Sequence, residues 1–196
     1  MKRIHSLLQF CAKAMAVIGG AVLVALIVMT CLSILGRAAN TMLHGWLDSG
    51  VWGDGAQWLI DSGIGAIRGD FELVEAGMAF CIFAFLPWCQ ISGGHAVVEI
   101  ATNRLPIPAN RVLVFVSEAL FATVLVVITL QLELGFERKL RSGQTTQLLQ
   151  MPIWWAYGAS LVGAALAAVM SIYVAVLRLL ELFGAAPLLP QVETQT

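Results

Sequence analysis

The sequence predicts an all-α integral membrane protein, a bundle of four transmembrane helices in a single membrane domain over residues 1–196. Long apolar runs alternate with polar stretches, and little chain is left for a separate soluble catalytic domain, so we expect no enzyme activity. Because lipid offers no partner for backbone N–H and C=O groups, apolar runs of this length must be helical. The four runs cover about 14–36, 73–92, 112–134 and 154–177.

The first run, Ala14 to Gly36, contains no Asp, Glu, Lys or Arg. At ~1.5 Å per residue it reaches about 35 Å, enough to cross a hydrocarbon core of roughly 30 Å. It follows Lys2, Arg3 and Lys13 but is longer than the apolar region of a typical secretory signal. We therefore expect an uncleaved membrane anchor.

The connection between the first two helices, 37–72, is the longest of the three and is rich in glycine and tryptophan. Tryptophan favours the membrane interface, and the apolar residues of its first part have helical spacing, whereas the glycines that follow weaken a continuous helix. These apolar residues are Leu43, Trp46, Leu47 and Val51. We predict a short interfacial helix followed by irregular chain, and a loosely ordered loop resting on lipid or a partner is the alternative.

The second helix is preceded by acidic residues, Glu72 among them, and Glu75 lies in its first turn. The connection after it contains Gly93-Gly94-His95, Glu99, Pro106 and Pro108, which predicts a tight exit and a turn. Pro152 and Trp154 mark the start of the fourth helix, since proline suits a first helical turn and tryptophan suits the interface.

Small residues recur along the fourth run at spacings of three or four, which places them on one stripe. Small side chains let membrane helices approach closely, so this stripe predicts a helix-packing face, although an alanine-rich composition alone would produce part of the pattern. Its members are Ala156, Ser160, Ala164, Ala167, Ser171 and Ala175.

The charge distribution favours a membrane location and gives weak information on topology. The net charge of −1 shows no excess of basic residues for nucleic-acid binding. With the N-terminus in the cytoplasm, six Lys and Arg residues fall inside and five outside. Because cytoplasmic segments are enriched in these residues, both termini are expected to be cytoplasmic.

Acidic residues inside membrane runs are candidate functional residues. Glu118 lies well within the third run, while Glu75 and Glu133 fall near the outer ends of their helices. We expect Glu118 to pair with Arg111 or Arg178 and so to fix the helix register. A contact with a partner protein and a role in ion or proton translocation are the alternatives.

Several kinds of chemistry are not supported by the sequence. The four cysteines have no metal-binding spacing, no pair of histidines lies in the membrane runs to bind haem, and no phosphate-binding loop motif is present. We therefore expect no catalytic residue, no metal and no cofactor.

The segment Ile91-Ser92-Gly93-Gly94-His95-Ala96-Val97-Val98-Glu99-Ile100 resembles the cytoplasmic signature that follows the second helix in DctQ-type small membrane subunits of TRAP (tripartite ATP-independent periplasmic) transporters. Glu72-Leu73-Val74-Glu75 is similar to the acidic entry to that helix, and Thr145 through Tyr157 to the entry to the fourth. The segment Leu177-Arg178-Leu179-Leu180-Glu181 adds to the resemblance at the close of the fourth helix. The resemblance spans most of the chain, whereas the insert 38–70 departs from the shorter loop of the family.

This resemblance implies a scaffold in stable heterodimeric contact with a large elevator-type membrane subunit. The complex would carry out Na⁺-coupled uptake of organic acids delivered by a periplasmic solute-binding protein, which docks transiently. It also implies a multi-pass protein of the bacterial inner membrane, surrounded by lipid, with 37–72 and 135–153 periplasmic and 93–111 cytoplasmic.

Two other functions stay open at this stage. One is an independent small membrane transporter that works as an oligomer. The other is a four-helix membrane thiol oxidoreductase, which would need paired cysteines near the outer surface that the 38–72 and 135–153 connections lack.

Overall fold

The computed structural model describes residues 2–49, 65–92 and 107–182, together with residues 55, 57, 58, 60 and 63. These residues form four long helices: α1 (Lys2–Asp48), α3 (Asp70–Ser92), α5 (Ile107–Ser142) and α6 (Trp154–Leu182). Each is long and apolar enough to cross a membrane. The predicted all-helical fold with four membrane-crossing helices is therefore confirmed.

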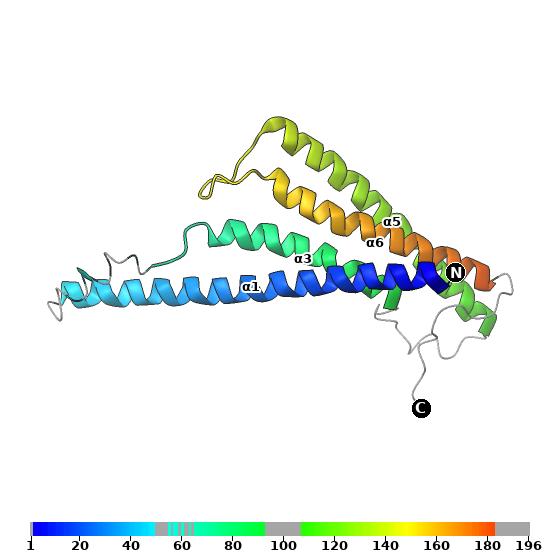
Figure 1. Cartoon of the computed structure of the whole chain (residues 1–196), viewed down its shortest axis with the longest axis horizontal. Coiled ribbons are helices and arrows are strands. Elements are labelled where there is room, and N and C mark those ends of the chain that lie inside the picture. Colours follow the sequence, from blue (N-terminus) through cyan, green and yellow to red (C-terminus); the bar gives the residue numbers. More distant parts are fainter. Residues whose placement is uncertain are drawn as a thin grey trace, which may run out of the picture.

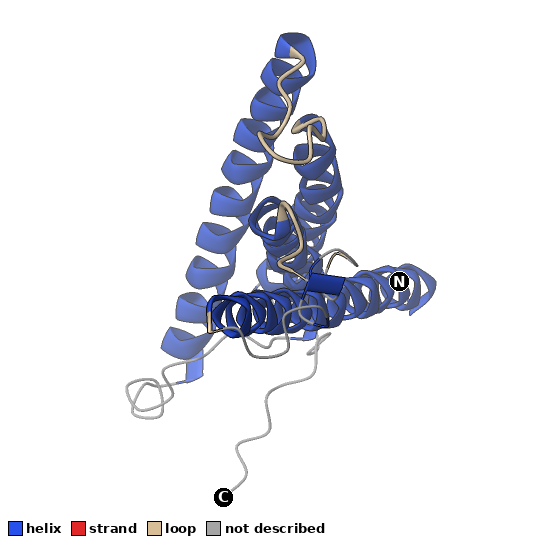
Figure 2. Ribbon diagram, turned by 90° about the vertical axis from the view of Figure 1, so that its left-hand side faces the viewer, coloured by secondary structure: helices blue, strands red, loops and turns tan. Residues whose placement is uncertain are grey.

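The helices are arranged as an open row in the order α1, α3, α6, α5 (Figure 1). Each packs mainly on its neighbours in the row, and α1 has only a small contact with α6. The α5–α6 pair leans away from α1 toward its connecting hairpin, so the helices do not surround one common core (Figure 2). In the most apolar stretch of α6, half of the residues are buried, whereas 6% are buried in the corresponding stretch of α1 and 11% in that of α5. Helix α6 is thus the most buried helix of the row, and α1 and α5 are its edges.

Glycines allow the close approach between neighbouring helices. A Cβ atom on Gly163 of α6 would lie 2.9 Å from the backbone carbon of Phe83 in α3, and one on Gly19 of α1 would lie 2.8 Å from the Cβ of Ala84. Close approach gives membrane helices their dispersion contacts, since lipid and protein side chains are equally apolar. These two positions set the spacing of α3 from both of its neighbours.

Helix α1 continues through the first part of the predicted connection and ends at Asp48. Leu43, Trp46 and Leu47 of the predicted short interfacial helix therefore lie on the C-terminal end of α1, and Val51 lies outside the described residues. Polar side chains there bond back to the helix: Thr41 Oγ1 donates to the carbonyl of Arg37 at 3.0 Å, and the His44 ring lies 2.8 Å from the carbonyl of Asn40. Gly45 is the only glycine between residues 37 and 48 of α1, and it does not break the helix. At ~1.5 Å per residue α1 is about 70 Å long, more than twice the thickness of a hydrocarbon core.

A short hairpin connects α5 to α6. Thr145 and Pro152 form an antiparallel bridge, and the Thr146 amide donates to the carbonyl of Met151 at 2.9 Å. Gly143, with a φ of 59°, ends α5 in the left-handed conformation that glycine adopts without strain. The hairpin therefore turns the chain back within about ten residues and places α6 against α5.

Candidate functional site: polar contacts that lock the helix row

The contact between α1 and the start of α3 centres on a buried carboxylate. Ser33 Oγ donates to Asp70 Oδ2 at 2.6 Å and accepts the backbone N–H of Ile67 at 3.2 Å. Arg37 Nη2 lies 3.4 Å from the same Asp70 oxygen, and the backbone N–H of Phe71 donates to Asp70 Oδ1 at 2.9 Å. Asp70 is 8% exposed and Ser33 is fully buried. Both carboxylate oxygens thus have donors, as a buried charge requires.

Ser33 contributes more to this contact than Arg37 does. The Arg37 side chain is 54% exposed and its distance to Asp70 is long, so solvent screens the ion pair. Gly36 permits the crossing, because a Cβ atom there would collide with the carbonyl oxygen of Gly65. The polar contact therefore fixes α1 against the chain that enters α3.

A second carboxylate, Glu72, joins the start of α3 to the α5–α6 hairpin. Its two oxygens accept the backbone N–H groups of Leu148 at 2.7 Å and Leu149 at 2.9 Å. The Leu149 side chain covers Gly69, where an added Cβ atom would lie 2.5 Å from Leu149 Cγ. Gly69 has a φ of 78°, a backbone conformation that favours glycine. The hairpin is thus held on α3 by hydrogen bonds to Glu72 and by the contact of Leu149 with Gly69.

At the opposite end of the row, Gln90 of α3 donates through Nε2 to Glu118 Oε2 of α5 at 2.8 Å. Gln90 is only 1% exposed, so its amide depends on protein partners. The expected pairing of Glu118 with Arg178 is not formed, because Arg178 bonds to Glu181 of its own helix at 2.9 Å. The side chain of Arg111 lies outside the described part of the chain. Glu118 therefore joins α3 to α5, which are not adjacent in the row.

The N-terminal end of α1 has its own contact with α6. Ala12 of α1 packs against Met170 of α6 and Ile91 of α3 in one buried cluster. Nearby, Tyr173 Oη and His5 Nδ1 are 3.4 Å apart. These contacts bring α1 to α6 at this end only, because the two helices diverge toward the hairpin (Figure 1).

The predicted packing residues of α6 lie toward the interior of the row. Ser160, Ala164, Ala167 and Ser171 are buried, and Ala156 and Ala175 are half-buried. Thr129 Oγ1 of α5 donates to the carbonyl oxygen of Ala164 at 3.2 Å, which requires a close approach of the two helices.

The other predicted residues are more dispersed. Glu75 and Glu133 are exposed. Pro152 takes part in the hairpin bridge, and Trp154 starts α6 with its ring edge-on to Phe136 at 6.2 Å. The predicted signature residues after α3 lie outside the described residues: Gly93, Gly94, His95 and Glu99.

Sequence reasoning missed Ser33, Asp70 and Gln90. Ser33 and Gln90 are polar residues within apolar runs, and this was the signal that could have identified them as buried hydrogen-bonding groups. Asp70 is one of several acidic residues in the first connection, and nothing in the sequence around it distinguishes it from a solvated charge. No sequence pattern predicted the partners of these residues, because each hydrogen bond joins positions that are far apart in the chain.

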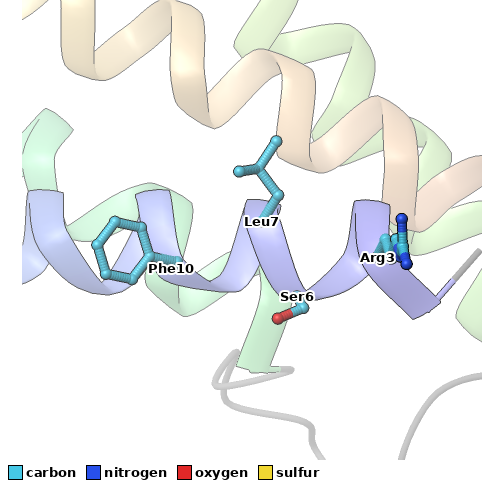
Figure 3. Close-up of a pocket in the computed structure, with 4 residues that line it drawn as sticks. All are labelled: Arg3, Ser6, Leu7 and Phe10. Atoms are coloured by element: carbon cyan, nitrogen blue, oxygen red, sulfur yellow. The ribbon is translucent and has the colours of Figure 1, made fainter.

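The described residues provide no evident catalytic or metal centre. Among them, no group of three or more His, Cys, Asp or Glu side chains could hold a metal ion. A hollow lined by Arg3, Ser6, Leu7 and Phe10 lies on the first turns of α1 (Figure 3). Because all four lining residues belong to one helix, this hollow is open and does not enclose a small molecule.

Comparison with known proteins assigns the chain to a family. Residues 63–182 match the family model "Tripartite ATP-independent periplasmic transporters, DctQ component". The match takes in α3, α5, α6 and the hairpin, covers more than half of the chain and begins after α1. No curated protein and no solved structure matches the chain. The chain therefore belongs to the DctQ family and is the small, non-enzymatic membrane component of a TRAP transporter.

Proposed function

We propose that this subunit is a fixed scaffold for the large elevator-type membrane subunit, in a transporter that couples Na⁺ entry to the uptake of organic acids. A periplasmic solute-binding protein delivers the substrate to the complex. The two membrane subunits form a stable heterodimer in the bacterial inner membrane.

The observation that carries this proposal is that polar side chains of the described helices bond to one another across the row. Ser33 and Asp70 join α1 to α3, and Gln90 and Glu118 join α3 to α5. Intramembrane polar groups of a transport pathway instead line broken helices or a water-filled cavity near the middle of the bilayer. Polar groups used to hold helices together suit a static support.

Large apolar side chains cover both edges of the row. Exposed examples are Leu35 of α1, at 65%, and Leu120 of α5, at 66%. Lipid covers part of these edges, and a large membrane partner has room to pack on the rest. The scaffold proposal requires such a surface.

The proposed topology places both termini and 93–111 in the cytoplasm and 37–72 and 135–153 in the periplasm. The basic residues Lys2, Arg3 and Lys13 near the N-terminus support it. In this orientation, the contact of Glu72 with the hairpin lies on the periplasmic side.

Purification and reconstitution test the proposal. A tagged form of this chain, expressed with the large subunit, is expected to bring that subunit down in a stable complex. In liposomes, the complex and its binding protein should take up substrate only with an inward Na⁺ gradient, and this chain alone should show no flux. Uptake by this chain alone would contradict the scaffold role and favour an independent transporter.

A further inference from the structure

Helix α1 carries an unbroken apolar stripe on the side that faces away from α3. The stripe begins at Leu7, continues with the residue three positions further along and then the residue four positions after that, in alternation, and ends at Gly45. We call it the outer stripe. All of its members are apolar, and all are exposed except the half-buried Ala14. Phe10 is 71% exposed and Met42 is 65% exposed, which shows that the surface is open at both ends.

The outer stripe has the spacing of one helix face that packs along another helix. Alternating steps of three and four give a period of ~3.5 residues, which keeps a seam facing a partner helix over a long distance. None of the polar side chains between residues 5 and 47 lies on it. The side toward α3 instead carries Ala12, Gly19 and Ser33, which are in contact with α3. The outer stripe is therefore a second interface face on α1.

The outer stripe is too long for lipid to cover it alone. From Leu7 to Gly45 it extends about 57 Å at ~1.5 Å per residue, against roughly 30 Å of hydrocarbon. Fitting it into the hydrocarbon core would need a tilt of about 60°, beyond the ~0–40° of membrane helices. Met42, on the outer end of α1, would face water if no protein covered it.

The exposed area is sufficient for a stable protein interface. Twelve large apolar side chains on and beside the outer stripe are between 44% and 71% exposed, an area of roughly 1,000 Å² that exceeds the ~800 Å² per partner of a standard interface. The exposed side of α5 is less uniformly apolar than the outer stripe, since it includes Ser117, Thr123, Gln131 and Glu133. The apolar docking face is therefore on α1.

Charge argues against a second copy of this chain as the occupant. Within α1, Lys2, Arg3, Lys13 and Arg37 are basic and Asp48 is the only acidic residue. Two α1 helices packed in parallel in the membrane would bring equal charges together with no acidic partner. Arg3 lies one step of four before Leu7, at the inner end of the outer stripe, where it borders the open hollow with Phe10 (Figure 3).

We propose that the outer stripe is the docking surface for a long helix of a different membrane protein, which places an apolar side chain in the hollow and a carboxylate or carbonyl oxygen opposite Arg3. The inference rests on the proposed function in taking this protein to be the large membrane subunit. It adds the face and the residues through which the two subunits bind.

Site-specific photo-crosslinking in membranes that contain the complete transporter tests this surface. A photoreactive amino acid is placed at Phe10, Val24 or Met42 on the outer stripe, and at Leu120, Val127 or Leu134 on the exposed side of α5 as matched controls. The expected result is an adduct with the large subunit at all three stripe positions, at least tenfold more abundant than at the α5 positions. An adduct of twice this chain's 21.1 kDa mass, adducts with lipid alone, or adducts confined to α5 would overturn the proposal.

A pair of matched substitutions gives an independent measurement. Ala21 on the outer stripe and Ala165 on α6 are both exposed alanines within apolar helices. Ala21→Leu is expected to reduce recovery of the large subunit with the tagged chain at least tenfold, and Ala165→Leu is expected to leave it unchanged. Gly45→Leu should act like Ala21→Leu, and its added Cβ would meet no other part of this chain within 4 Å.

The outcomes separate the two proposals. A complex that forms normally in the Ala21→Leu and Gly45→Leu variants would overturn the docking surface and leave the scaffold role intact. If the unsubstituted chain recovers no large subunit, the scaffold role fails, and the docking surface fails with it.

Discussion

The carboxylate of Glu72 accepts the backbone N–H of Leu148 at 2.7 Å, across 76 positions of sequence. A second bond from the Leu149 amide occupies its other oxygen. The hairpin between α5 and α6 therefore depends on α3 for its position, although α5 follows α3 in the chain and lies at the far edge of the row. This contact orders the periplasmic surface in the proposed topology.

Removal of the Glu72 carboxylate should release the hairpin. In Glu72→Ala, we expect amide hydrogen exchange of Leu148 and Leu149 to accelerate at least tenfold, because both N–H groups lose their acceptors. Hydrogen exchange with mass spectrometry on the detergent-purified complex measures this. The control is Glu75→Ala, which removes an exposed carboxylate one turn away. Equal acceleration in both variants would show that charge, and not the hydrogen bonds, holds the hairpin.

Ser33→Ala should destabilise the contact between α1 and α3. It leaves the buried Asp70 carboxylate without its shortest hydrogen bond, at a cost of about 1–3 kcal/mol. Arg37→Gln should cost less, because the Arg37 side chain is half-exposed. Thermal unfolding of the purified subunit in detergent gives the order of the two effects. A larger loss in Arg37→Gln would mean that the ion pair dominates.

The Glu118 variants distinguish a structural role from an ion-carrying one. Glu118→Gln keeps an oxygen that can accept from Gln90 Nε2, so assembly and most transport should be retained. Glu118→Leu leaves the buried Gln90 amide without this acceptor, at about 1–3 kcal/mol, and should lower the melting temperature of the complex. Uptake and complex recovery are measured for both variants. A Glu118→Gln variant that assembles fully but does not transport would assign ion coupling to this residue.

Gly163→Ala should separate α6 from α3. The added methyl group would lie 2.9 Å from the Phe83 backbone, and such overpacking costs about 1–3 kcal/mol. Gly20→Ala is the matched control, since its added Cβ meets no atom within 4 Å and alanine raises helix propensity by up to about 1 kcal/mol. Thermal unfolding of the isolated subunit should therefore shift in opposite directions. A neutral Gly163→Ala would show that the helices adjust at this crossing.

Cysteine labelling tests the topology. In a background without the four native cysteines, Ser49→Cys and Ser142→Cys should react with a membrane-impermeant maleimide added to intact cells. Ala96→Cys should react only after the membrane is permeabilised. Labelling of Ala96→Cys in intact cells, with protection of the other two sites, would invert the topology.

The local pattern predicted the helices better than their contacts. The apolar runs at 14–36 and 154–177 each lie within one observed helix, because a backbone in lipid must satisfy its hydrogen bonds within its own segment. The first helix extends beyond the apolar run that ends at Gly36, because Thr41 and His44 bond back to the helix and α1 continues to Asp48. Propensity alone did not reveal this, since Gly45 weakens a helix without ending it.

By itself, the sequence determined the fold class, the four apolar runs long enough to cross a membrane and the residues on which the family resemblance rests, because each follows from composition and spacing within a short segment. Only the tertiary structure decided that α6 lies between α3 and α5, that Gln90 is a partner of Glu118, and that Asp70 and Glu72 hold different elements. The order of the helices and the partners of these side chains depend on which apolar helix faces pack together. Between almost wholly apolar helix faces many pairings have similar energies, and a few buried hydrogen bonds and glycine contacts select among them.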